Sequence, residues 1–128
     1  MILIGVNRAI DTEKSVVFVQ TPADIAKTKA GALIVLNYNE SDLEIYANLE
    51  VPFAVKINSV KEFIFLSATK AKYAIAELNL AIKTQKIAEN YLTDLKVLAI
   101  AEANEIEVLA DKNIDGIFAN DLIKSFLK

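Results

Sequence analysis

The sequence predicts an α/β fold, with an open, mostly parallel sheet of five or six strands and helices on both faces in a Rossmann-like three-layer arrangement. Short apolar runs rich in β-branched residues recur about every twenty residues, and segments with helical spacing separate them. This alternation requires crossover connections, which make neighbouring strands parallel. A chain of 128 residues is long enough for one hydrophobic core. We therefore expect a single domain over residues 1–128, built from repeated short βα units.

The clearest unit spans residues 51–62, VPFAVKINSVKE. Pro52 can open a strand without giving up a ladder donor, and residues 53–57 have the composition of a strand buried on both faces. Ser59 and Glu62 stand at capping-box spacing. This spacing predicts that the Ser59 side chain accepts from the amide of Glu62, while Glu62 reaches back to the amide of Ser59.

The amino-terminal half begins with the apolar residues 1–6, whose pairing as a strand is left open, and continues with a firmer strand at residues 16–20. Thr21 and Pro22 then start a short helix that is expected to end near residue 29. The next predicted elements are a strand at residues 32–36 and a helix capped by Ser41 with Glu44.

The carboxyl-terminal half repeats the pattern. A helix is predicted from residue 60 to about 70, and Asn79 is expected to cap the longest helix. The remaining predicted elements are strands at residues 73–78, 97–101 and 117–119, helices beginning near Asn104 and Asn120, and a turn at Asp115-Gly116.

Composition excludes several classes of function. The net charge is -3 and Arg8 is the only arginine, which argues against nucleic-acid binding. The sequence has no Cys and no His, so thiolate chemistry and the commonest metal ligand are absent and no metal site is predicted. No apolar run approaches the roughly 18 residues of a membrane span. We therefore expect a cytoplasmic protein without membrane insertion.

Polar residues follow the predicted strands, where ligands bind in parallel sheets. Helix amino-terminal amides and a lysine at this edge would suit a small anionic or nucleotide-like ligand. Helix capping alone also explains Ser and Asn at such positions. The candidate ligand-binding residues are Asn37, Asn39, Lys56, Asn58, Ser59, Glu77, Asn79 and Glu102.

Lys56 is the most informative single residue, because it interrupts an otherwise apolar strand. It could bind phosphate, or form a Schiff base with a carbonyl substrate while Glu77 or Glu102 acts as acid or base. The simpler alternative is a salt bridge between Lys56 and Glu77. Neither Gly-rich phosphate-binding motif can be formed from the three glycines of the chain.

The helix at residues 60–70 is apolar around most of its girth. Phe63, Phe65 and Leu66 therefore belong either to a core helix or to the interface of a homodimer, and the sequence leaves both open.

Residues 32–92 resemble the second half of the TrkA-N type nucleotide-binding domain of regulators of potassium conductance. ALIVLNYNESDLEIYANLEVPFAVKI is similar to that family's strand, polar turn, helix and strand beginning at Val-Pro, and AKYAIAELNLAIKTQKIAENYL resembles its next strand and helix. The resemblance implies a Rossmann-like sheet and a regulatory, dimerising role without catalysis.

From these observations we expect a ligand-sensing or protein-interaction module that is not an enzyme and forms a homodimer. The alternative is an enzyme-like βα domain that acts on a small phosphorylated or carbonyl substrate through Lys56, Glu77 and Glu102. No motif in the sequence indicates a particular cofactor.

Overall fold

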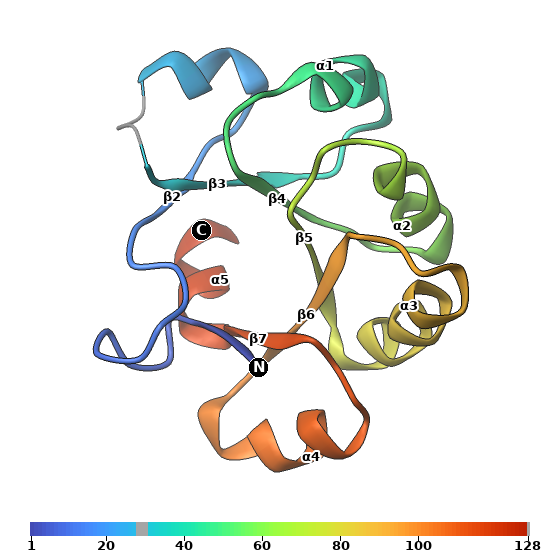
Figure 1. Cartoon of the computed structure of the whole chain (residues 1–128). Helices are drawn as coiled ribbons and strands as arrows, with labels where there is room; N and C mark the ends of the chain where they lie inside the picture. Colours follow the sequence, from blue (N-terminus) through green and yellow to red (C-terminus); the bar gives the residue numbers. More distant parts are fainter. Residues whose placement is uncertain (28–30, 128) are drawn as a thin grey trace.

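The computed structural model describes residues 1–27 and 31–127 of the chain and confirms a parallel α/β fold (Figure 1). Its sheet has seven strands rather than five or six, in the order β1-β7-β6-β5-β4-β3-β2, and every neighbouring pair is parallel. The strands are β1 (Ile2–Ile4), β2 (Val16–Phe18), β3 (Leu33–Asn37), β4 (Phe53–Lys56), β5 (Tyr73–Glu77), β6 (Lys96–Ala101) and β7 (Gly116–Ala119).

From β2 onward, helical segments connect the strands in chain order. The expected end of the first helix, near residue 29, lies outside the described residues. The helical elements are η1 (Pro22–Lys27), η2 (Glu40–Asp42), α1 (Leu43–Asn48), α2 (Val60–Ser67), α3 (Leu78–Tyr91), η3 (Ala103–Glu105), α4 (Ile106–Asp111) and α5 (Asn120–Leu127). None of the helices in the described part of the chain is long and apolar enough to cross a membrane.

Four helices, α1 to α4, cover the outer face of the sheet (Figure 1). Their inward side chains, among them Tyr46, Phe63 and Leu66, join alternate strand residues such as Phe53 and Val55 in one buried cluster. All five of these side chains are fully buried. Burial of this apolar area is the main force that holds the helices to the sheet.

The inner face of the sheet curls around α5, which is the one helix on this side among the described residues (Figure 1). The other set of alternating strand residues, including Val35, Ile75 and Phe118, forms a second buried cluster there, and Ile123 of α5 packs into it. Both faces are therefore buried. This explains why the strands are continuous apolar runs rather than alternating ones.

The strand order runs from β2 to β7 without reversal and ends with β1 beside β7. Strands β1 and β2 are thus the two edges, and no pairing between them occurs among the described residues. The segment between them is tied to β1, because Leu3 donates to the hydroxyl of Thr12 and accepts from its amide. The sheet is consequently curled but remains open.

Gly116 departs from its expected place in a turn, because it is the first residue of β7. It lies beside Ile2 of β1 in the register, and a Cβ built there would be 2.4 Å from the Ile2 carbonyl oxygen. The glycine is needed for the close approach of two backbones, and the chain turns before it, at Lys112 and Asn113, with a bend at Asp115.

Candidate functional site

Four predicted site residues lie at the carboxyl ends of adjacent strands. Asn37, Lys56 and Glu77 are the last residues of β3, β4 and β5, and Glu102 directly follows β6. Each stands two residues after a member of the inner cluster, namely Val35, Ala54, Ile75 and Ile100. Because side chains alternate along a strand, all four belong to the inner face of the sheet.

The register of the sheet staggers these residues. Asn37 pairs with Lys56, whereas Lys56 pairs with Ile75, so Glu77 stands two residues further along its strand. That offset corresponds to about 7 Å. Neither ion pair of the described residues includes Lys56, so the Lys56–Glu77 salt bridge offered by the sequence is not formed.

Lys56 has one polar partner in the described part of the chain. Its Nζ donates to Oδ1 of Asn58 at 3.1 Å. The side chain is only partly exposed. The structure therefore places an ammonium group without a counter-ion at the carboxyl edge of the sheet, held toward the loop that leads into α2.

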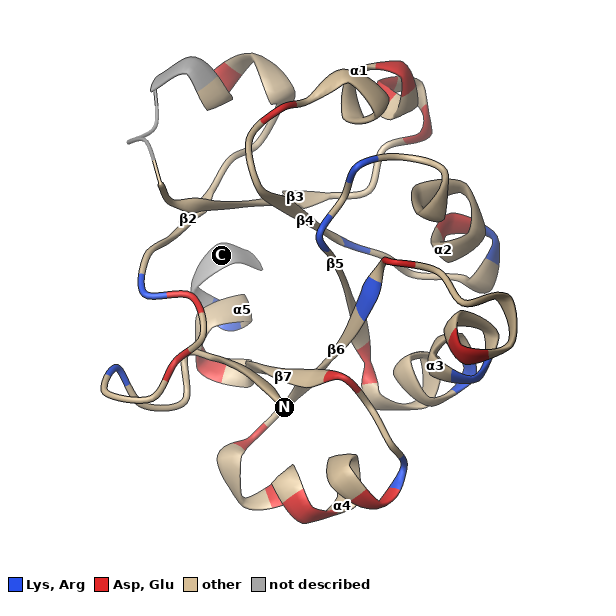
Figure 2. Cartoon of the chain, viewed as in Figure 1, with Lys and Arg blue, Asp and Glu red and all other residues tan. Residues whose placement is uncertain are grey.

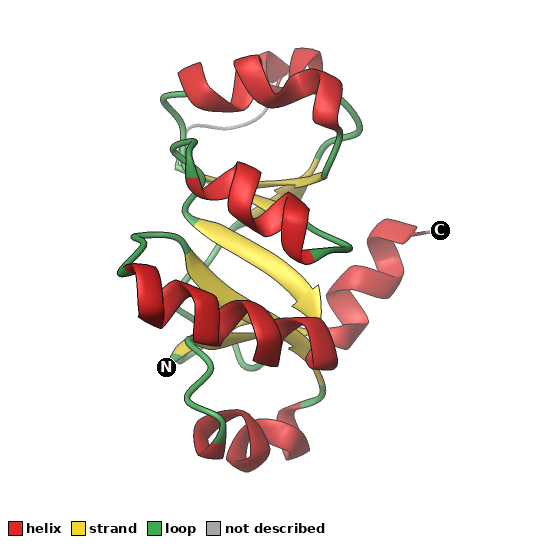
Figure 3. Cartoon of the chain, turned by 90° about the vertical axis from the view of Figure 1, so that its right-hand side faces the viewer, coloured by secondary structure: helices red, strands yellow, loops and turns green. Residues whose placement is uncertain are grey.

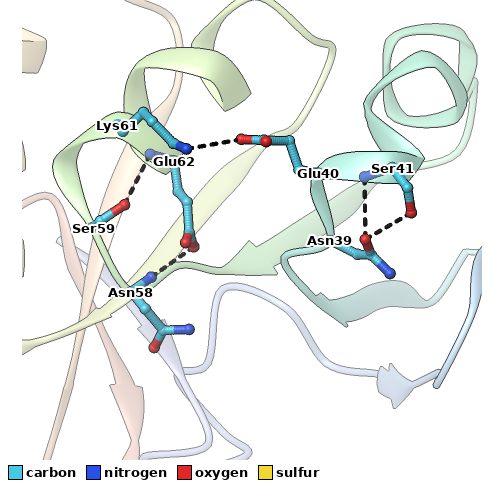
Figure 4. A network of polar contacts seen from close by, with 7 residues as sticks. All are labelled: Asn39, Glu40, Ser41, Asn58, Ser59, Lys61 and Glu62. Carbon is cyan, nitrogen blue, oxygen red and sulfur yellow. Dashed lines mark hydrogen bonds and ion pairs between the residues drawn. The ribbon is translucent and has the colours of Figure 1, made fainter.

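Two neighbouring loops at this edge are joined by a polar network (Figure 4). In the loop before α1, Oδ1 of Asn39 accepts from the amide of Ser41 at 3.1 Å and from its hydroxyl at 2.8 Å. Lys61 of α2 bridges the loops by pairing with Glu40 at 3.2 Å. Asn39, and not the expected Ser41, is thus the capping residue in this loop.

The predicted capping box at α2 is only half formed. Oγ of Ser59 accepts from the amide of Glu62 at 3.2 Å, as expected. The carboxylate of Glu62, however, accepts from the amide of Asn58 at 2.9 Å and not from that of Ser59 (Figure 4). The Glu62 carboxylate thus binds the amide one residue before Ser59. This bond holds in place the backbone of Asn58, the residue that accepts from Lys56.

Asn79 does not take its predicted role, and Glu102 caps the helical turn that follows it. Helix α3 begins directly after β5, with Glu77 at its N-cap, so Asn79 lies inside the first turn and caps nothing. Glu102 caps η3 in a reciprocal box with Glu105, whose carboxylate accepts from the Glu102 amide at 3.0 Å.

A cavity of about 250 Å³ opens at the carboxyl ends of β1, β6 and β7. Gly5 forms part of its wall, together with the side chains of Glu102, Asn120 and Asp121. Helix α5 crosses this end of the sheet, toward which the strands run (Figure 3). The sequence pointed to Glu102 in this wall but not to Gly5, because the pairing of the first strand was left open.

Helix α5 lies against the first strand at Gly5. A Cβ at this glycine would meet Cδ1 of Leu122 at 2.4 Å, and its φ is +78°. Leu122 packs against the inner cluster that contains Ile4 and Ile123. The absence of a side chain at Gly5 therefore lets α5 approach the mouth of the curled sheet.

Two tyrosines lie beside the site. The hydroxyl of Tyr38 is buried without a hydrogen-bond partner among the described residues, and burial, with the nearby charges of Glu40 and Glu62, raises its pKa. The hydroxyl of Tyr46 donates to the carbonyl of Asn37 at 3.3 Å. Burial raises the pKa of Tyr46 to about 12. Both phenols therefore remain neutral near pH 7.

The three residues assigned to a dimer interface are in different environments. Phe63 and Leu66 are fully buried beneath α2, whereas Phe65 is 41% exposed. Phe63 and Leu66 therefore contribute to the core of the chain itself, and only Phe65 offers surface to a partner.

The arrangement provides a cation, amide groups and carboxylates at one edge of the sheet, so it can hold a small polar ligand. Among these groups, the amine of Lys56 is the type that can form a Schiff base with a carbonyl compound. No group of three metal-ligating side chains occurs in the part of the chain that the structure describes. No protein-family model matches the chain, and no curated protein matches its sequence.

Proposed function

We propose that this chain is a cytoplasmic ligand-sensing module, not an enzyme, that binds a small anionic ligand at the carboxyl edge of its sheet. The single observation that supports this proposal is Lys56, whose ammonium group on the inner face has no counter-ion among the residues that the structure describes. Such a charge at the edge of a parallel sheet is stabilised when an anion neutralises it.

Neighbouring groups support the same proposal. Asn37 lies beside Lys56 in the register and can add a hydrogen-bond donor, and Asn58 orients the ammonium group. The resemblance of residues 32–92 to the TrkA-N type domain favours a regulatory role and makes NAD and adenine nucleotides ligands worth testing. Inorganic phosphate and pyrophosphate test the anion itself.

The experiment is thermal unfolding of the purified chain with phosphate, pyrophosphate, ATP and NAD. A ligand at a hundredfold excess over its dissociation constant stabilises the folded state by about 2.7 kcal/mol, which raises the melting temperature by about 10 °C. Lys56→Gln should remove most of this rise. Lys86→Gln is the matched control, because Lys86 is an exposed lysine on α3, away from the sheet edge. A flat panel, or an equal rise in Lys56→Gln, would contradict the proposal.

A second candidate function is covalent catalysis on a small carbonyl compound, including a phosphorylated one. It is favoured by the inner-face positions of Lys56, Glu77 and Glu102 at the carboxyl ends of three successive strands. Lys56 would condense with the carbonyl and release water, and a carboxylate would transfer protons. Borohydride would reduce the Schiff base, so mass spectrometry should find the trapped adduct on Lys56. A binding module gives no adduct.

A further inference from the structure

The outward surface of α2 and α3 carries exposed apolar side chains. Ile64 is 51% exposed, Phe65 41% and Tyr91 78%. At about 200 Å² for a large side chain, these fractions correspond to about 350 Å² of apolar surface. A stable interface buries about 800 Å² per partner, with an apolar centre and a polar rim. The three side chains are therefore enough for the centre of such an interface.

Two apolar grooves flank α2. The groove between α1 and α2 has a volume of about 480 Å³, and Phe65 and Glu44 are among its lining residues. The groove between α2 and α3 has a volume of about 290 Å³ and is lined by Ile64, Ile87 and Tyr91 among others. Tyr91, the most exposed of these side chains, stands beside the smaller groove, and the larger groove has room for such a ring.

The two sides of this surface differ in charge, because acidic residues mark η2 and α1, whereas α3 carries lysines as well as an acidic residue (Figure 2). Residues 40–48, in η2 and α1, include Glu40, Asp42 and Glu44 and no lysine or arginine. Helix α3 carries Lys83 and Lys86 against the single acid Glu89. Lys83 shares the helical stripe of Ile87 and Tyr91, at spacings of four residues, so it borders the groove between α2 and α3.

We propose that this surface binds a second copy of the chain, around a two-fold axis that runs along α2. Such an axis sets the acidic α1 side of each copy against the basic α3 side of the other. Glu44 of each copy therefore pairs with Lys83 of the other, which gives two equivalent ion pairs. The same rotation carries Tyr91 of each copy over the larger groove of the other. Self-complementarity of this kind is what an isologous dimer requires. The proposal goes beyond ligand binding, because it concerns the opposite face of the sheet.

The first measurement is sedimentation equilibrium of the wild-type chain, which should be a dimer at submillimolar concentration. Phe65→Lys should weaken the dimer while the melting curve of the diluted protein stays cooperative, because Phe65 lies outside the core. A wild-type chain that is monomeric at submillimolar concentration, or that forms open-ended oligomers, would overturn the proposal.

Charge reversal tests the axis. Glu44→Lys and Lys83→Glu should each raise the dimer dissociation constant at least tenfold, since each places like charges together twice. The double variant should restore wild-type association. Lys112→Glu and Glu107→Lys are the matched controls, since they make the same charge changes on exposed residues at α4, away from the grooves. Single variants without effect, or a double variant without rescue, would refute this arrangement.

Discussion

Glu13 forms side-chain hydrogen bonds with two residues that lie 59 and 60 positions away in the chain. It lies in the segment that connects the two edge strands, and its Oε2 accepts from Lys72 Nζ at 2.7 Å and from the Tyr73 hydroxyl at 2.7 Å. Tyr73 begins β5, near the middle of the sheet, and is 2% exposed. The carboxylate therefore ties the open edge of the curled sheet to its centre. We predict that Glu13→Ala destabilises the fold substantially.

The size of this destabilisation can be worked out from the two partners of Glu13, Lys72 and Tyr73. The Lys72 side chain is 48% exposed, so its ion pair contributes at most about 1 kcal/mol. The Tyr73 hydroxyl is buried, and a buried donor that loses its acceptor costs about 1–3 kcal/mol. We therefore expect Glu13→Ala to lower the free energy of unfolding by about 2–3 kcal/mol, most of it through Tyr73 rather than Lys72.

Urea denaturation of a double-mutant cycle separates these contributions. Tyr73→Phe removes the donor, so Glu13→Ala should cost much less in that background, with a coupling energy of about 1–2 kcal/mol. Lys72→Met should cost no more than about 1 kcal/mol. If Glu13→Ala changes the free energy of unfolding by under about 0.5 kcal/mol, or if the cycle is additive, the contact does not hold the sheet edge.

The same contact predicts an acid-sensitive component of stability. Burial alone would raise the pKa of Glu13, but the hydrogen bonds from Lys72 and Tyr73 and the lysine charge outweigh it and lower the pKa. A lowered pKa means that the stabilisation is complete above the unfolded value of about 4.3 and is lost as the pH falls below it. Glu13→Gln should flatten this part of the pH profile. A variant profile parallel to that of the wild type would contradict the assignment.

Two further predictions concern single buried positions. Gly116→Ala should destabilise the fold by about 1–3 kcal/mol in urea denaturation, because its Cβ would approach the Ile2 carbonyl oxygen to 2.4 Å; an unchanged midpoint would refute this. Tyr46, with its pKa raised to about 12, contributes stability that is complete below about pH 10 and is lost as the pH rises toward 12. Absorbance titration at alkaline pH should lose the amplitude of one late-titrating phenolate in Tyr46→Phe, and a titration curve equal to that of the wild type would contradict the assignment.

The strands could be predicted because their signal is local. A run such as residues 53–57 is apolar and β-branched-rich because both of its faces are buried. The strand order could not be predicted, because it depends on which runs pair across the whole chain. The short run at residues 2–4 becomes a strand through its pairing with β7, whose Gly116 admits the Ile2 backbone. A close backbone approach of this kind leaves no local pattern.

Part of the site could be predicted for the same reason. The rule that polar residues follow buried strands located Asn37, Lys56, Glu77 and Glu102 at one edge, since alternation fixes their face. The partner of each side chain could not be predicted. Glu62 reaches the amide of Asn58, and Glu13 reaches Tyr73 from sixty positions away in the chain. Such contacts depend on how distant segments pack in three dimensions, which the spacing of residues along the sequence does not predict.

The two proposed surfaces lie on opposite faces of the sheet, and this allows their tests to be separated. Lys56 faces the inner side with Ala54, whereas Phe65 stands on the outside of α2, beyond the fully buried Phe63 and Leu66. Lys56→Gln should therefore leave the sedimentation behaviour unchanged, and Glu44→Lys should leave the thermal shift produced by an anion unchanged. If either variant alters both measurements, the two surfaces communicate through the sheet, and the network that joins Glu40 to Lys61 would be the first connection to remove.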